Sequence, residues 1–248
     1  MKVLKFGGTS VGSSKNINKV ISILENYSKS DAVICVVSAV GGITDKLLLA
    51  GKQAQNKDIS YKDTLNLIKD IHFSIINELN LGIGELITQH IDSKFNELED
   101  LLNGIYLINE LSPKTSDKLV SFGETISSFI IAETMKNRDL SAERKNSQDL
   151  IITNSNFTKA EVDYNITNKN LQDYFKSATQ GVTILPGFIS KSKMGEQTTL
   201  GRGGSDFTAA IIAAALNVEQ LEIWTDVSGM YTTNPKMVKQ AYPIDKIS

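Results

Sequence analysis

The stretch AVICVVS, residues 32–38, most restricts the folds open to this chain, because it is apolar at nearly every position. A strand buried on one face alternates apolar and polar side chains, whereas a strand covered on both faces is apolar throughout. Other short runs rich in β-branched residues predict strands at residues 3–6, 150–153, 182–185 and 221–225. We therefore expect a mostly parallel sheet with helices on both sides.

Between the predicted strands, apolar residues recur at the three- and four-residue spacing of amphipathic helices. The run from Ile17 to Leu24 follows this spacing, and residues 57–109 are patterned almost entirely as helix. Strands that alternate with helices predict an α/β protein, here a three-layer αβα sandwich in one domain, with 57–109 as a helical layer or lobe. Residues 187–200 predict a hairpin whose tip spans residues 191–195.

The composition argues against several classes of protein. The 248 residues include 41% hydrophobic residues and carry a formal net charge of −2, unlike the basic surfaces of duplex-binding proteins. The longest apolar run, residues 209–216, is far below the roughly 20 residues of a membrane span. The single cysteine, Cys35, indicates a reducing compartment. We therefore expect a cytoplasmic protein that binds neither nucleic acid nor a membrane. His72 and His90 have no Cys or His partners at metal-ligand spacing, which leaves a zinc site and a Ser-His-Asp hydrolase without support.

The segment KFGGTSVG, residues 5–12, follows the first predicted strand and precedes a helix. Glycine lets the backbone approach a phosphate, and the next helix offers free N–H groups and the positive end of its dipole. The segment is not a Walker A loop, because Gly12 is followed by two serines rather than by Lys-Ser/Thr. A tight structural turn is the alternative, and the position of Lys5 just before the glycines favours a phosphate site.

The stretch SAVGGITDKLL, residues 38–48, places a second glycine loop directly after the apolar strand. Ligands of open α/β sheets bind at the carboxyl ends of the strands, so we expect this loop to lie at the same edge as the first. Thr44 or Asp45 would then either cap the following helix or contact a ligand.

Glu124 is the most informative charge within SFGETISSFIIAETM, residues 121–135. Helical periodicity places it on one face with Val120, Ser127 and Ile131, and thus among apolar neighbours. A buried carboxylate must be paired or have a raised pKa. Glu124 therefore either binds the ammonium group of a ligand or pairs with a lysine elsewhere in the chain.

The segment GRGGSDFTAAIIAAAL, residues 201–216, combines an arginine among glycines with the start of a helix. Its likeness to the dinucleotide fingerprint G-x-G-x-x-G is weak, because Asp206 occupies the last glycine position. Arg202 is suited to bind a carboxylate or phosphate through two parallel hydrogen bonds, and Ser205 or Asp206 is expected to cap the helix. A helix cap beside a surface arginine is the alternative.

Residues 221–236, LEIWTDVSGMYTTNPK, place polar groups just after the last predicted strand. Such groups at a strand end suit an adenine-ribose pocket with a cation near the phosphates. The residues concerned are Thr225, Asp226, Tyr231 and Lys236. We expect Trp224 to lie in the core rather than to form a stacking platform.

The segments KFGGTSVG, SFGE, GRGGSD and EIWTDVSGMYTTNP, in this order and at these spacings, resemble the aspartate kinases of the amino acid kinase superfamily. The resemblance covers essentially the whole chain and implies the amino acid kinase (carbamate kinase-like) fold. It also implies that MgATP phosphorylates the β-carboxylate of L-aspartate, giving 4-phospho-L-aspartate, the first step toward lysine, threonine and methionine. A carboxylate nucleophile is already ionised at pH 7, so this chemistry requires no general base.

The resemblance further implies roles for individual residues. Lys5 would contact the phosphates and stabilise the transition state, and Asp206 would orient that lysine or help to place Mg²⁺, with no dedicated metal site. Aspartate would be bound by Thr44, Glu124, Arg202 and Ser205, with Glu124 pairing with its ammonium group. ATP would be bound by Lys5, Gly7, Gly8, Ser10, Thr225, Asp226, Tyr231 and Lys236.

Two features depart from the family pattern. Lys236 stands where the family usually has arginine, which would replace a bidentate phosphate contact by a point charge. The family continues into a further kinase segment and ACT regulatory domains, so we expect residues 1–248 to be a catalytic domain truncated before both.

Four related points accompany this resemblance. The wording EIWTDVSGMYT is closer to relatives fused to a homoserine dehydrogenase, and a homodimer is expected from the family. The alternatives within the superfamily are kinases for glutamate, N-acetylglutamate or UMP. A nucleotide- or amino-acid-binding fragment without turnover is the alternative outside it. Glu124 favours a substrate with a free amino group.

Overall fold

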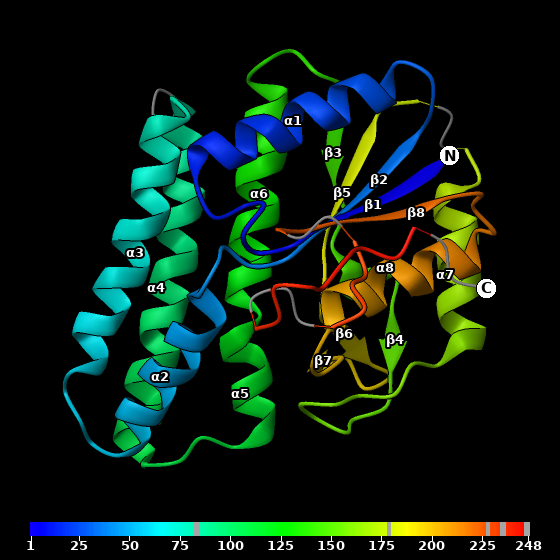
Figure 1. Ribbon diagram of the computed structural model, residues 1–248. Coiled ribbons are helices and arrows are strands. Elements are labelled where there is room, and N and C mark those ends of the chain that lie inside the picture. The colour runs from blue at the N-terminus through cyan, green and yellow to red at the C-terminus, as the bar shows by residue number, and fades with distance from the viewer. Residues whose placement is uncertain (82–84, 178–179, 227–228, 234–236, 246–248) are drawn as a thin grey trace.

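The computed structural model describes residues 1–81, 85–177, 180–226, 229–233 and 237–245. Within these ranges the main sheet has the strand order β3-β5-β2-β1-β8, with every neighbouring pair parallel (Figure 1). The strands span Ala142–Arg144 (β3), Val182–Pro186 (β5), Val33–Val37 (β2), Lys2–Phe6 (β1) and Leu221–Trp224 (β8). The parallel sheet predicted from the sequence is confirmed.

Helices lie on both sides of this sheet, as Figure 1 shows, so the three-layer αβα architecture is confirmed. On one side lie α1 (Ser14–Ser28), α2 (Ile43–Gln55), α3 (Tyr61–Glu78), α4 (Glu85–Ile108), α5 (Pro113–Val120) and α6 (Phe122–Lys136). On the other side lie α7 (Tyr164–Phe175) and α8 (Gly204–Ala215). Helices α3 and α4 form the helical layer that residues 57–109 predict.

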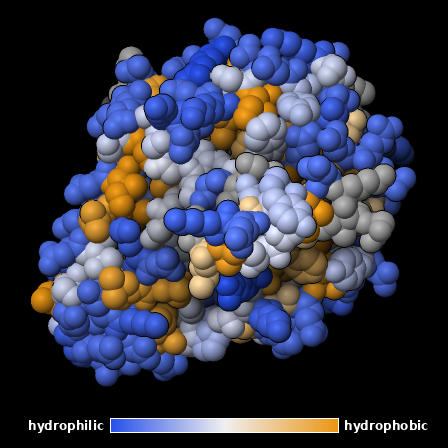
Figure 2. Space-filling model, viewed as in Figure 1, coloured by the Kyte–Doolittle hydropathy of each residue, from blue (hydrophilic) through white to orange (hydrophobic). Residues whose placement is uncertain are grey.

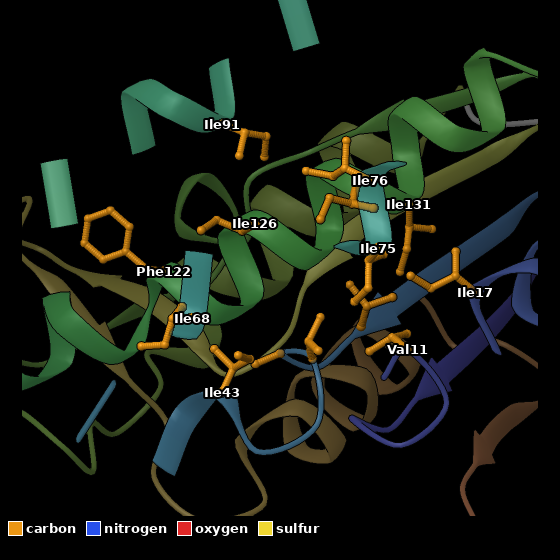
Figure 3. Close-up of a cluster of buried hydrophobic side chains, with 14 of the residues drawn as sticks. Val11, Ile17, Ile43, Ile68, Ile75, Ile76, Ile91, Phe122, Ile126 and Ile131 are labelled. Carbon is orange, nitrogen blue, oxygen red and sulfur yellow. The ribbon is translucent and has the colours of Figure 1, made fainter. Parts of the chain in front are cut away.

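Strand β2 explains why the sequence AVICVVS is apolar throughout. Val33, Cys35 and Val37 point into the core formed with α1–α6. Ile34 and Val36 point into the second core, formed with α7 and α8. Figure 3 shows the first core, where isoleucines of α1, α2, α3, α4 and α6 meet. A polar residue on either face of β2 would therefore be buried without a partner.

A smaller sheet lies below the main one and has the strand order β4-β6-β7. Its strands are β4 (Ile152–Thr153), β6 (Ile189–Ser192) and β7 (Gln197–Thr199). Strands β6 and β7 pair antiparallel, which confirms the predicted hairpin, with a tip at residues 193–196 rather than 191–195. This hairpin delivers the chain to the GRGGSD segment.

One predicted strand needs correction, and one observed strand was not predicted. The strand expected at residues 150–153 is shorter, because the carbonyl of Ser147 accepts hydrogen bonds from the N–H groups of Leu150 and Ile151 and holds this part in a turn. Strand β3 was not predicted, since its three residues, Ala-Glu-Arg, carry no apolar pattern. It forms the edge of the sheet and pairs with β5 alone.

The surface in the view of Figure 1 is mainly hydrophilic, with scattered hydrophobic groups that are largest over the α2–α4 side (Figure 2). Exposed apolar side chains of these helices include Leu49, Leu86, Leu107 and Ile108. Leu86 lies at the amino end of α4 and Leu107 and Ile108 at its carboxyl end, whereas Leu49 lies midway along α2. No helix in the described part of the chain combines the length and apolarity needed to cross a membrane.

His72 of α3 is a polar group inside the first core. It is fully buried, and its Nδ1 lies 2.8 Å from the carbonyl oxygen of Ile68. Its Nε2 has no hydrogen-bond partner among the described residues, and the ring meets the edge of Phe95. Burial lowers the pKa of His72 to about 4, although the hydrogen bond to Ile68 opposes this. The ring is therefore neutral and packs inside the first core.

We predict that His72→Phe stabilises the protein, and more so in acid. The substitution removes an unsatisfied buried nitrogen, which costs about 1–3 kcal/mol. Because the pKa of His72 is lower in the folded state, the unfolded chain binds an extra proton between pH 6.5 and about 4. The wild type should therefore lose on the order of 3 kcal/mol across that window through this residue. Urea unfolding at pH 7 and pH 5 measures both effects, and an equal pH dependence in the two proteins contradicts the prediction.

Candidate active site

A cavity of about 520 Å³ lies at the carboxyl ends of β1, β2 and β5. The amino ends of α2, α6 and α8 border it from the helix layers on both sides of the sheet. It brings together seven of the residues expected at the site: Lys5, Gly8, Thr44, Glu124, Arg202, Ser205 and Asp206. These residues come from four separate segments of the chain, which the parallel strands bring to one edge.

Lys5 and Asp206 form an ion pair across the cavity floor. Strand alternation turns Leu4 and Phe6 into the first core, so Lys5 points to the opposite face, where α8 lies. Its Nζ lies 2.7 Å from Oδ1 of Asp206, in the first turn of α8. The lysine side chain is 9% exposed and the aspartate 49%. A buried ammonium needs a counter-charge, and Asp206 supplies it while remaining open to the cavity.

The two glycine loops pack directly on each other. A Cβ atom on Gly8 would come within 3.0 Å of the carbonyl oxygen of Ala39, and one on Gly41 within 3.3 Å of that of Gly8. Such contacts are tighter than nine in ten real Cβ contacts, and the neighbouring atoms here belong to the backbone, so both positions favour glycine. The loop after β1 is therefore held against the loop after β2, and the backbone at Gly8 is accessible from the cavity.

Helices α2 and α8 both begin after a glycine in the left-handed conformation. Gly42 has a φ of 75° and Gly203 a φ of 73°, and neither helix has a side-chain cap. The expectation of a side-chain cap is therefore wrong for Thr44, Asp45, Ser205 and Asp206. Because these side chains do not cap their helices, those that line the cavity are available to a ligand. The two helix ends also direct free N–H groups and positive dipole ends toward the cavity, which favours anions.

Glu124 lies in the first turn of α6 and is 4% exposed. Its Oε2 has no hydrogen-bond partner among the described residues. Burial raises the pKa of Glu124 to about 8, although the backbone N–H groups of Ala39 and of Glu124 itself, and the charge of Lys5, oppose the rise. Lys5 is paired with Asp206, so the alternative of a dedicated lysine partner is not what the structure shows. One carboxylate oxygen thus stays unpaired beside the cavity.

Arg202 lies in the exposed loop between β7 and α8 and borders the same cavity. It makes no ion pair within the part of the chain that the structure describes. Ser205 is buried next to it, packed so closely on Gly187 that a Cβ there would come within 2.6 Å. The cavity therefore has an exposed cationic side chain, Arg202, at its rim and a buried carboxyl group, Glu124, in its wall.

A second cavity of about 360 Å³ lies between α1 and the carboxyl end of β8. Of the residues expected to bind ATP, it contains Ser10, Thr225 and Asp226. The N–H of Gly7 donates to the carbonyl of Trp224 and ties the two sides of this cavity together. Lys5 and Gly8 line the first cavity, so the KFGG segment runs between the two.

The remaining residues considered in the last segment have three different outcomes. Tyr231 lines neither cavity and forms an isolated antiparallel bridge with Pro243. Lys236 lies outside the described residues. Trp224 was expected in the core, which is wrong: it is 37% exposed and stacks on Phe6, with ring centroids 6.0 Å apart. Because β8 is an edge strand whose end is exposed, Trp224 instead forms a wall of the second cavity.

Asp117 of α5 is a cavity residue that the sequence analysis missed. It is 1% exposed and accepts hydrogen bonds from Thr158 and Thr199. The available signal was helical periodicity, because Asp117 lies three residues before Val120 and seven before Glu124. Phe188, just after β5, also lines the cavity and was not singled out.

Comparison with known proteins places this geometry in a family. The amino acid kinase family matches the chain over residues 1–248. Aspartokinase 1, chloroplastic, of Arabidopsis thaliana is 36% identical over 98% of this chain and 43% of its own length. The lysine-sensitive aspartokinase 3 of Escherichia coli is 34% identical over 99% of this chain and 53% of its own length.

A solved structure shares both the sequence and the fold. Escherichia coli aspartokinase III, crystallised with aspartate and ADP in the R-state, superposes with a TM-score of 0.89 and 33% identity. The match covers 99% of this chain and 53% of that chain. The chain thus spans about half the length of the relatives it matches. It belongs to the amino acid kinase family.

Proposed function

We propose that this chain is the catalytic part of an aspartate kinase, which transfers the γ-phosphoryl group of ATP to the β-carboxylate of L-aspartate. The observation that carries this proposal is the unpaired Oε2 of Glu124 in the wall of a cavity that also contains Lys5 and Arg202. One buried carboxyl group, which ionises beside an ammonium, and two cations complement a substrate with one ammonium and two carboxylates. The similarity to aspartokinases over nearly the whole chain supports the same substrate.

Glu124 and Arg202 hold the α-carbon groups of aspartate in this proposal. The ammonium pairs with Glu124, which lowers the pKa of the glutamate from its raised value and satisfies the orphan oxygen. Arg202 binds the α-carboxylate, for which a planar guanidinium offers two parallel N–H donors. Thr44 and Ser205, in the first turns of α2 and α8, add hydrogen bonds from opposite sides.

Lys5 stabilises the charge that develops during transfer. The β-carboxylate of aspartate is ionised at neutral pH and attacks without a general base, so the enzyme has to align two anions and neutralise their charge. The ammonium of Lys5 and the amino ends of α2 and α8 converge on the cavity floor, where the γ-phosphoryl group would meet that carboxylate. Asp206 holds the ammonium of Lys5 in place through their ion pair.

The nucleotide extends from the second cavity into the first. Ser10, Thr225 and Asp226 hold the nucleoside end, and the backbone of Gly7 and Gly8 leads its phosphates toward Lys5. Mg²⁺ is usually held by substrate phosphates, water and one or two carboxylates. The described residues contain no group of three His, Cys, Asp or Glu suited to a metal, and the half-exposed Asp206 fits this lighter demand. When bound, Mg²⁺ would neutralise phosphate charge.

Other substrates of the superfamily fit the cavity less well. N-acetylglutamate and UMP have no free ammonium group, so each would leave Glu124 buried and unpaired, at a cost of about 1–3 kcal/mol or more. Glutamate keeps the ammonium and differs from aspartate by one methylene group, so it has to be tested. Contacts of ATP with Tyr231 and Lys236, and a homodimer, stay predictions of the family resemblance.

The test is acyl phosphate formation. The protein is incubated with MgATP, hydroxylamine and aspartate, glutamate or N-acetylglutamate, and the hydroxamate formed is measured. We expect product with aspartate, and Lys5→Ala should lower the turnover by about 10²–10³-fold because it removes a group that stabilises the transition state. Lys2→Ala is the matched control, since Lys2 lies on the same strand but pairs with Asp31 outside the cavity.

Two results would sink the proposal. One is the absence of hydroxamate with aspartate from a folded protein that binds ATP, and the other is product with glutamate alone. A Lys5→Ala variant with the turnover of Lys2→Ala would show that Lys5 has been given the wrong role.

Binding of aspartate should release a proton near neutral pH. The pKa of Glu124 is about 8 in the free protein, so its carboxyl group is mostly protonated at pH 7. An ammonium at its side favours the ionised form, so aspartate affinity rises with pH up to about 8 and close to one proton leaves on binding at pH 7. Calorimetry in buffers of different ionisation enthalpy counts the protons. Little release is expected at pH 9, and none in Glu124→Gln; a count that this variant leaves unchanged contradicts the assignment.

A further inference from the structure

Asp117 lines the substrate cavity, yet its carboxylate is committed to the protein. Its Oδ2 accepts hydrogen bonds from the N–H of Thr158 at 2.8 Å and the N–H of Thr199 at 3.1 Å. Its Oδ1 accepts one from the hydroxyl of Thr199 at 2.7 Å. Asp117 therefore joins α5 to the end of β7 and to the loop before α7. Burial raises the pKa of Asp117, and the hydrogen bonds from Thr158 and Thr199 oppose that rise because they favour the ionised form.

The first partner, Thr158, is held in a strained conformation. Its φ is 70°, in the left-handed region that β-branched residues rarely occupy. Such a conformation persists only where the surroundings enforce it. Its carbonyl oxygen lies so close to Gly201 that a Cβ there would come within 3.2 Å. The hydrogen bond from Thr158 to Asp117 thus holds a backbone segment that packs against the loop between β7 and α8, residues 200–203, here called the Arg202 loop.

The second partner, Thr199, is the residue from which the Arg202 loop departs. The loop contains Gly201 and Gly203, with φ of 75° and 73°, and glycines give it conformational freedom. One end is fixed where Gly204 packs on Phe188 and donates its N–H to the carbonyl of Gly201. The other end is fixed by the two hydrogen bonds from Thr199 to Asp117.

Asp117 also shares a helical face with Glu124. Ser121 joins α5 to α6 with helical dihedral angles (φ −65°, ψ −18°), and its N–H donates to the carbonyl of Asp117. The two carboxylates are therefore carried by a nearly continuous helical segment. By holding Thr199, Asp117 sets the distance between the Arg202 loop and Glu124.

We propose that Asp117 is a positioning residue that fixes the Arg202 loop relative to Glu124 and thereby selects aspartate over glutamate. The inference rests on the proposed function. With the ammonium on Glu124 and the α-carboxylate on Arg202, the α-carbon has one position, and the length of the side chain decides whether its carboxylate reaches the phosphoryl group beside Lys5. The extra methylene of glutamate places its carboxylate more than 1 Å away, which is enough to lower the rate about 10²-fold.

The test compares Asp117→Ala with Asp117→Asn in the hydroxamate assay. We expect Asp117→Ala to raise the KM for aspartate about 10–100-fold, to leave the KM for ATP within about threefold, and to lower the preference for aspartate over glutamate about 10-fold. Asp117→Asn should recover most of this, because its Oδ1 accepts from both N–H groups while its Nδ2 donates to the Thr199 hydroxyl. Asp70→Ala, an exposed aspartate of α3, is the control.

The proposal is overturned if Asp117→Ala raises the KM for aspartate and the KM for ATP by equal factors. It is also overturned if the folded variant keeps the wild-type preference for aspartate over glutamate. If Asp117→Ala does not fold, Thr199→Val removes only the hydroxyl bond, and Thr199→Ser restores it. The proposal is supported if the KM for aspartate rises about 3–10-fold in Thr199→Val but not in Thr199→Ser. It is overturned if the two variants have the same KM for aspartate.

Hydrogen exchange separates this inference from the proposed function. In the ligand-free protein, Asp117→Ala should speed amide exchange at residues 157–160 and 199–204 and leave β1 unchanged. A wild type that makes no product with aspartate overturns the function and the substrate selection together. Unchanged exchange at 199–204 in an active enzyme overturns the positioning role alone.

Discussion

The free-energy cost of ionising a buried carboxyl group that has no partner cation governs this site. Glu124 meets that cost by staying protonated, as its raised pKa of about 8 shows. Because its pKa is higher in the folded than in the unfolded state, the ligand-free protein loses stability as pH rises from about 4.5 to 8. In the proposed function, a substrate ammonium removes this penalty. Part of the binding free energy therefore comes from satisfying the Glu124 carboxyl group, which is unsatisfied in the ligand-free protein. A ligand without an ammonium group would leave it unsatisfied.

The surrounding groups make that single contact selective, because they are held rigidly. Gly8 and Gly41 press the two phosphate-side loops together, and Asp206 fixes the ammonium of Lys5. On the opposite wall, Asp117 anchors Thr199 and so the loop that carries Arg202. The parallel sheet supplies the common edge on which these elements converge. The contacts between these loops and side chains, together with the topology of the parallel sheet, thus define one binding geometry.

Much of this arrangement follows from the sequence, for physical reasons. An apolar run rich in β-branched residues, such as residues 32–38, suits a strand covered on both faces, and helical spacing correctly places Glu124 among buried neighbours. What failed depends on long-range contacts. Helix α8 begins after Gly203, whose left-handed conformation the sequence signals for caps do not reveal, and the exposure of Trp224 reflects its place on an edge strand. Asp117 was missed because its partners, Thr158 and Thr199, are distant in sequence.

The pairing between Glu124 and a substrate ammonium is tested most directly by a cycle of four dissociation constants. Calorimetry measures L-aspartate and succinate, which lacks the ammonium, with the wild type and with Glu124→Gln at pH 8. We predict a coupling free energy of about 1.5–3 kcal/mol, so that the wild type prefers aspartate by roughly 10–100-fold more than the variant does. A coupling free energy of zero would contradict the account, because the ammonium would then not be bound by Glu124.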